Sequence, residues 1–163
     1  MAIDLTEPLV AALHQRLVDD LPAAVAAVNA EVDDGYELAA PDDAQILPYI
    51  PPPSDLLSPP TIGVGEGTSR FEDDIGSSAT GRHELLIVVY EQTADQLGLA
   101  LRLRRWARVL TRVALEGRSL PPVAWGTGLV GTAPGPTLVD DADNPREWFS
   151  WTGIRIWAKT EEE

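Results

Sequence analysis

The feature that most limits how this chain can fold is a run of prolines near its middle. Residues 41–60 hold seven of the 14 prolines, including Pro51-Pro52-Pro53 and Pro59-Pro60. Proline lacks a backbone N–H and has a fixed φ, so such a run can form neither a helix nor a central strand. We therefore expect residues 41–60 to make an extended surface crossing. Its apolar residues, among them Tyr49 and Ile50, indicate that it is strapped onto the core or onto a partner.

The segment before this crossing has a helical pattern. Between residues 6 and 32, apolar side chains recur at steps of three and four, which places them on one broad stripe: Leu9, Val10, Leu13, Leu17, Leu21, Val25, Val28 and Val32. Thr6 suits the N-cap, and Pro8 suits the first turn. Pro22 interrupts the pattern, so the sequence predicts either a kinked helix or two abutting helices with Asp20 capping the second.

Two strands are predicted after the prolines. Residues 61–67 indicate a short strand, and residues 82–92 a stronger one that is apolar on both faces and therefore central. The intervening residues 68–81 are small and polar, which predicts a long exposed hairpin loop. This loop carries a run of three acidic residues: Glu72, Asp73 and Asp74.

A second helix and two further strands complete the pattern. Residues 94–116 are predicted to be helical, with Thr93 and Gln96 as a capping box. The region 123–160 predicts two strands, at 123–132 and 147–160, which a loop at 133–146 separates. The order helix, strand, strand, helix, strand, strand favours an α+β fold, with a mostly antiparallel four-stranded sheet and the helices packed on one face. At 163 residues, we expect one domain, residues 1–163.

Composition excludes several classes of function. With 12 basic and 26 acidic residues the formal net charge is −14, which would repel nucleic-acid phosphates over most of the surface. Without cysteine there is no disulfide framework, thiolate metal site or cysteine nucleophile. No apolar run approaches the length of about 20 residues that a membrane span needs, and we expect a soluble protein made in the cytoplasm.

The chain carries no recognisable catalytic motif, so we expect no enzyme activity, no cofactor and no metal. His14 and His83 stand alone in their segments, which favours structural roles. The acidic run at residues 140–144 has the oxygen ligands of a calcium site, but it lacks the spacing of an EF-hand. A small metal-dependent enzyme that uses residues 140–144 stays open as an alternative.

The predicted helix 94–116 stands out by its charge. Residues 94–118 carry six arginines against two acidic residues, a net charge of +4, which leaves −18 on the rest of the chain. Four of these arginines lie opposite the apolar arc of the helix: Arg104, Arg105, Arg108 and Arg112. We call these four residues the arginine row.

Two interpretations of the arginine row are open. It is either a solvated helix face or a subunit interface. Leu97 and Leu101 project among the arginines, and a freely solvated face gains nothing from exposed leucines. Mixed arginine and leucine is typical of interfaces, and the obvious complement is an acidic surface on another copy. A ring would bring two different patches of one protein together. We therefore predict a subunit interface at Leu97, Leu101, Arg104, Arg105, Arg108 and Arg112.

The whole pattern resembles a known group, the tail terminator family and its neighbours among the minor structural proteins at the neck of tailed bacteriophages. The matching segments are Leu-Val-Asp-Asp-Leu-Pro-Ala-Ala-Val at 17–25, Pro60-Thr-Ile-Gly-Val, Glu84-Leu-Leu-Ile-Val-Val-Tyr, and Leu103-Arg-Arg-Trp-Ala-Arg-Val-Leu. The resemblance is one of pattern and order and covers nearly the whole chain. The long proline segment and the loop 133–146 depart from it, which leaves open whether the chain is a terminator or another neck protein.

The resemblance implies a non-enzymatic virion protein, assembled in the host cytoplasm. It implies a ring, usually hexameric, that caps the tail tube and docks it to the head connector, with no cofactor and no membrane. Its partners would be further copies of itself, the tail tube protein and the head-tail connector proteins. DNA would pass through the lumen without specific binding, and Glu72, Asp73 and Asp74 would reach a neighbouring ring. The alternatives are a stopper or adaptor protein of the neck, or a monomeric acidic protein-binding module.

Overall fold

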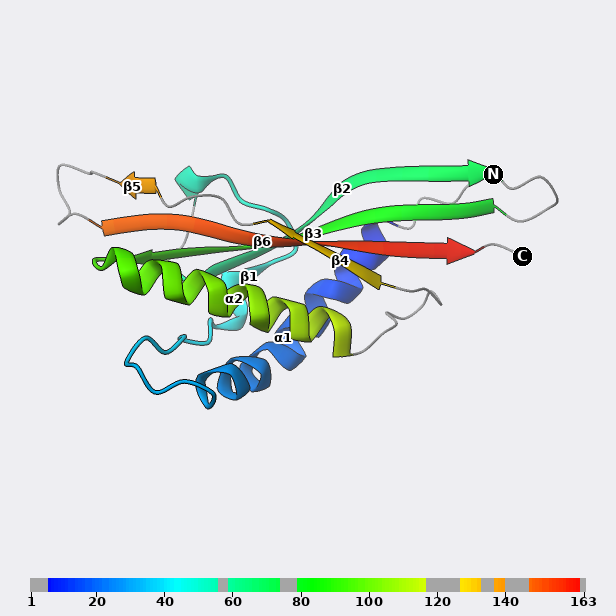
Figure 1. The fold of residues 1–163 in the computed structure, drawn as a ribbon. Coiled ribbons are helices and arrows are strands. Elements are labelled where there is room, and N and C mark those ends of the chain that lie inside the picture. Colours follow the sequence, from blue (N-terminus) through cyan, green and yellow to red (C-terminus); the bar gives the residue numbers. More distant parts are fainter. Residues whose placement is uncertain are drawn as a thin grey trace.

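Two α-helices lie on one face of a twisted β-sheet (Figure 1). The structure, a computed structural model, describes residues 6–55, 59–73, 79–116, 127–132, 137–139 and 147–161. The helices are α1 (Thr6–Asn29) and α2 (Gln96–Glu116), and short 3-10 turns occur at Asp43–Gln45 and Pro53–Asp55. The strands are β1 (Ile46–Leu47), β2 (Thr61–Asp73), β3 (Ala79–Thr93), β4 (Thr127–Thr132), β5 (Thr137–Val139) and β6 (Glu147–Glu161).

The sheet confirms the predicted α+β class. Its four longest strands follow the order β2-β3-β6-β4, and every neighbouring pair among them is antiparallel. Two short strands extend it: β1 pairs with β2 in parallel, which makes the sheet mixed, and β5 pairs with β6. As predicted, β3 is central, between β2 and β6.

The apolar stripe of the first segment does form the helical side of the core. Its residues Leu9, Leu13, Leu17, Leu21, Val25 and Val28 are buried against the sheet and α2. The alternative of two abutting helices is wrong, because α1 is continuous through Pro22. Pro22 lies on the exposed side of α1, where its ring displaces no core side chain. His14 donates from Nε2 to the carbonyl oxygen of Ile46 at 2.9 Å, a structural role that ties α1 to β1.

The proline-rich crossing is strapped onto the core. Pro51 and Pro60 are buried, and the Tyr90 hydroxyl donates to the Pro51 carbonyl at 3.0 Å. A Cβ on Gly63 would lie 2.8 Å from the Tyr49 carbonyl oxygen and 2.9 Å from the Pro51 ring. Glycine at position 63 therefore lets this segment lie directly on the backbone of β2.

The predicted loop at residues 68–81 is largely wrong. β2 continues to Asp73, and β3 begins at Ala79, with a ladder from Ser69↔His83 to Asp73↔Ala79 that follows an irregularity after Glu66. The residues of this segment are small and polar, so they lack the alternation that marks a half-buried strand. Pairing with β3, which also pairs with β6 as far as Thr80↔Glu161, makes strands of them nonetheless.

As a result, three strands run on past the helices. Figure 1 shows β2, β3 and β6 extending beyond the C-terminal end of α2. β6 has 15 residues, which span about 50 Å when extended, whereas the 21 residues of α2 span about 30 Å. We call residues 66–73, 79–84 and 157–161 the ribbon.

The remaining boundaries agree with the sequence pattern to within a few residues. The predicted helix 94–116 is α2, and the predicted strand 147–160 is β6. Of the predicted strand 123–132, residues 127–132 form β4, and residues 123–126 lie outside the described ranges. The predicted loop 133–146 contains β5. Its acidic run at 140–144 lies outside the described residues.

Candidate functional site

Asp95, not Thr93, caps the start of α2. The backbone N–H groups of Leu97 and Gly98 donate to the two carboxylate oxygens of Asp95, each at 3.1 Å. Thr93 instead accepts a hydrogen bond from the Asp95 N–H at 3.4 Å, so the predicted capping box of Thr93 and Gln96 is wrong. An aspartate cap satisfies two free N–H groups and places a negative charge at the positive end of the helix.

Within the arginine row, Arg105 is turned inward. Its relative exposure is 5%, and its guanidinium donates to the carbonyl oxygen of Tyr36 and to the carboxylate of Asp34. Both partners belong to the connection that follows α1. The hydrogen bond from Arg105 lowers the pKa of Asp34, with help from the Tyr36 N–H. Arg105 thus fastens this connection to α2.

Arg108 and Arg112 use the same connection. Both donate to the carboxylate of Glu31, Arg112 at 2.7 Å from its Nη2 to Oε1. The two hydrogen bonds, that of Arg112 first, hold the pKa of Glu31 below its usual value. The sequence predicts acidic partners for these arginines on a second copy. For Arg105, Arg108 and Arg112, the same chain supplies the acidic partners.

The connection is held at two further points. The ring of Tyr36 lies on Gly98, where a Cβ would come within 2.8 Å of the ring, and a hydrogen bond with Asp95 raises the pKa of the Tyr36 hydroxyl. The Asn29 side chain bonds both the N–H and the carbonyl of Leu38, each at 2.9 Å. Residues 29–38 are thereby fixed along α2. We call them the docked connection.

The remaining predicted interface residues do face outward. Leu97 is 60% exposed, Leu101 is half-buried, and Arg104 is exposed with no ion pair among the described residues. These three residues keep the predicted interface open on the N-terminal half of α2. Leu97 is one of three large apolar side chains exposed in the described chain, with Tyr49 and Trp151.

Sequence reasoning missed a buried polar group beneath α2. Glu91 is 4% exposed and accepts a hydrogen bond from the Trp106 indole at 2.9 Å. Burial raises the pKa of Glu91, and this effect outweighs the Trp106 hydrogen bond and the charge of Arg102, which both lower it. The Nη1 atom of Arg102 lies 3.9 Å from the Oε1 atom of Glu91. The sequence placed Trp106 in the core, and a buried indole needs an acceptor, but nothing in the pattern identified Glu91 as that acceptor.

The predicted acidic run at residues 72–74 begins within β2. Glu72 and Asp73, which we call the acidic tip, are the last two residues of β2 and pair with Thr80 and Ala79, while Asp74 lies outside the described residues. Glu72 and Asp73 therefore lie at the end of the strand pair β2–β3, within the ribbon. Their predicted contact with a neighbouring ring stays a prediction.

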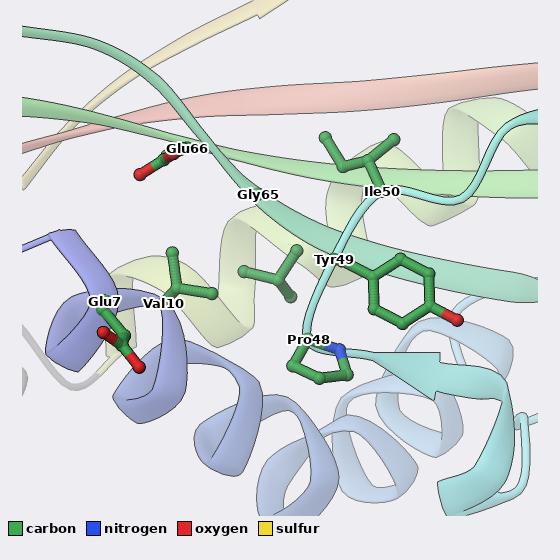
Figure 2. A pocket seen from close by; sticks show the side chains of 8 residues that line it. Glu7, Val10, Pro48, Tyr49, Ile50, Gly65 and Glu66 are labelled. Atoms are coloured by element: carbon green, nitrogen blue, oxygen red, sulfur yellow. The ribbon is translucent and has the colours of Figure 1, made fainter.

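A groove of about 430 Å³ lies beside β2. Figure 2 shows its walls: Glu7 and Val10 from α1, Pro48 to Ile50 from the proline-rich crossing, and Gly65 and Glu66 from β2. The walls are mainly aliphatic, with two carboxylates at the rim. No convergent set of three His, Asp or Glu side chains able to hold a metal ion occurs in the described ranges.

Comparison with protein families and with curated proteins finds no match. No protein-family model matches the chain, and no curated protein matches it. Neither helix of the described chain has the length of apolar sequence that a bilayer crossing requires.

Proposed function

We propose that the chain is a structural subunit of the neck of a tailed bacteriophage, the tail terminator. In this role it forms a ring, usually a hexamer, that caps the tail tube and docks it to the head connector. The proposal combines the sequence resemblance with one observation of the fold, the ribbon. The helices do not reach the far end of the ribbon (Figure 1), and a sheet needs a covering layer to bury its faces.

Assembly supplies such a cover. In a ring, the sheet of each subunit lies against its neighbours, and the ribbon can also reach the adjacent tail-tube or connector ring. The acidic tip at Glu72 and Asp73 then meets a different protein. An acidic total charge suits a conduit for DNA, because like charge disfavours binding to phosphates.

The ion pairs of the docked connection reduce the set of residues that we propose for the contact between subunits. Arg105, Arg108 and Arg112 each pair with an acidic residue of their own chain, so we place the contacts between subunits elsewhere. Of the arginine row, Arg104 alone joins Leu97 and Leu101 as a candidate for a contact with another copy.

A monomeric acidic protein-binding module is the second candidate. The exposure of Leu97 and Tyr49, at 60% and 56%, favours it, since isolated exposed apolar side chains can anchor a partner. Such a protein would remain a monomer and bind its partner in a small complex of fixed stoichiometry.

The test is whether the purified protein assembles into a ring, alone or on purified tail tubes of its phage. We expect light scattering to give a multiple of the 17.6 kDa subunit and negative-stain microscopy to show rings with an open channel. A protein that stays monomeric alone and leaves the ends of the tubes bare would overturn the proposal.

A further inference from the structure

At each edge of the sheet, a stretch of strand has no outer partner among the described strands, and the two stretches match in length. β1 covers the outer edge of β2 only at Ile62 and Gly63, and beyond Gly63 no described strand lies on that side of β2. At the opposite edge, β4 pairs with β6 alone among the described strands. Unpaired edges present rows of N–H and C=O groups that accept another strand.

We propose that neighbouring subunits of the ring join by pairing these edges. Residues Val64–Ser69 of β2 in one copy pair with β4 of the next copy. This inference rests on the proposed ring and names the surfaces that close it. The occupant of the free edge of β2 is thus a second copy of this chain.

The strand registers place the two edges at the same height in the sheet. Ser69 is opposite His83, His83 is opposite Ala158, and Ala158 is opposite Thr127. At the other end of the free length, Val64 is opposite Ile87, Ile87 is opposite Ile154, and Ile154 is opposite Gly131. The free length of β2 is therefore level with β4, and a rotation about an axis along the strands brings the two together.

Strand direction also fits. Since β2, β3, β6 and β4 alternate in direction, β4 runs opposite to β2. A neighbouring β4 beside β2 would therefore continue the antiparallel order of the sheet across the interface. Such a contact joins two different edges of one protein, which is the head-to-tail geometry that closes a ring.

The groove provides room at the point where β1 ends. It lies along Val64, Gly65 and Glu66, with Val10, Pro48 and Ile50 as aliphatic walls, and so borders the part of β2 that we propose to pair. The six residues of β4, Thr-Gly-Leu-Val-Gly-Thr, carry no charge, so they can approach the carboxylates of Glu7 and Glu66 without repulsion.

Charge disfavours the competing arrangement in which two β2 edges meet about a two-fold axis. An antiparallel pair of Val64–Ser69 segments would bring Glu66 of one copy close to Glu66 of the other. Like charges opposite each other across strands are destabilising. Pairing between β2 and β4 avoids this contact.

The experiment uses the absence of native cysteine. In the double variant Ser69→Cys/Thr127→Cys, the two thiols lie three strand spacings apart within a chain, about 14 Å. A disulfide needs Cα atoms within about 7 Å, so any disulfide must link two copies. We expect mild oxidation to convert most of the protein into a ladder of covalent multimers that ends at the ring size on a non-reducing gel.

Matched variants decide between arrangements. Each single variant, Ser69→Cys or Thr127→Cys, should stay uncrosslinked alone and give dimers when the two are mixed. The pair Glu66→Cys/Leu129→Cys, at the next matching level of the sheet, should crosslink as the first pair does. The pair Glu37→Cys/Thr127→Cys, with an exposed residue of the docked connection, should not. Circular dichroism and thermal melting confirm that each variant is folded.

Light scattering of the unoxidised protein separates the two proposals. Rings without crosslinks in either double variant would overturn the edge pairing and leave the ring standing. Dimers formed by Ser69→Cys alone would show a two-fold contact between β2 edges and would also overturn it. A monomer under all conditions would overturn the proposed function itself.

Discussion

The arginine row and the ribbon differ in how the fold departs from the sequence prediction. On the sequence, the arginine row has the composition of an interface, yet Arg105, Arg108 and Arg112 find their acidic partners in the docked connection of the same chain. The ribbon includes residues 68–73 and 79–81, which the sequence predicts as part of a loop whose acidic run reaches a neighbouring ring. In the fold it extends past the helices (Figure 1). The difference teaches that concentrated charge indicates a need for partners and does not say which chain supplies them.

The largest expected effect lies in the arginine row. Arg105→Ala leaves the Tyr36 carbonyl and the Asp34 carboxylate without their donor. We expect the free energy of unfolding to fall by about 2 kcal/mol, as for hydrogen bonds to charged groups. Arg104→Ala, one position earlier and exposed, is the matched control and should change stability by less than about 0.5 kcal/mol. Urea unfolding measures both, and equal losses would break the distinction between the two arginines.

The contact between Tyr36 and Gly98 sharpens the comparison further. In an open helix, replacing glycine by alanine gains about 1 kcal/mol. In Gly98→Ala the new Cβ would meet the Tyr36 ring at 2.8 Å, so we expect a net loss of about 1 kcal/mol instead. In a Tyr36→Ala background the same substitution should stabilise the protein. A double-mutant cycle that shows no change of sign would mean that the docked connection is not seated on α2.

Glu91 should make the free energy of unfolding decrease as the pH rises. Burial raises its pKa in the folded state, so its contribution is favourable below the unfolded value of 4.5 and is lost as the pH rises through the raised pKa. Glu91→Gln retains an acceptor for Trp106 and removes the buried charge. We expect the stability of this variant relative to the wild type to increase as the pH rises from about 4 to about 7. A constant difference over this range would contradict the buried, ionisable Glu91.

Glu31 and Asp34 should have a smaller and opposite effect, because they make the free energy of unfolding decrease as the pH falls. Their arginine partners lower both pKa values from 4.5 and 3.8, so their stabilisation is present above these values and is lost as the pH falls through the lowered pKa values. The double variant Glu31→Gln/Asp34→Asn should be less stable than the wild type near neutral pH, with the gap closing in acid. Thermal melts across the acid range check this, and a gap that persists at the lowest pH would argue against the ion pairs.

The sequence predicted the elements whose side chains show a period. The stripe of α1, the central position of β3, and the extents of α2 and β6 all follow from spacing, because burial on one face repeats every 3.6 or 2 residues. Residues 68–73 and 79–81 have no such signal, since a strand pairs through its backbone whatever its side chains are. The partners of Arg105 and Arg108 lie about 70 residues or more away in sequence, and periodicity within a helix carries no information on which distant residue packs there.

The mass of the assembly tests the central claim, that the arginine row stabilises the subunit while the sheet edges join subunits. Arg108→Glu/Arg112→Glu reverses the charges that face Glu31, and Thr68→Pro places a proline within the edge segment Val64–Ser69 of β2, where proline hinders pairing with another strand. Thr68 is skipped in the register with β3, and proline is tolerated at such irregularities. The arginine variant should be less stable in urea unfolding but keep the mass of the ring by light scattering. The folded Thr68→Pro variant should have the mass of a monomer. The opposite result, in which the arginine variant dissociates and the Thr68→Pro variant keeps its ring, would contradict the account.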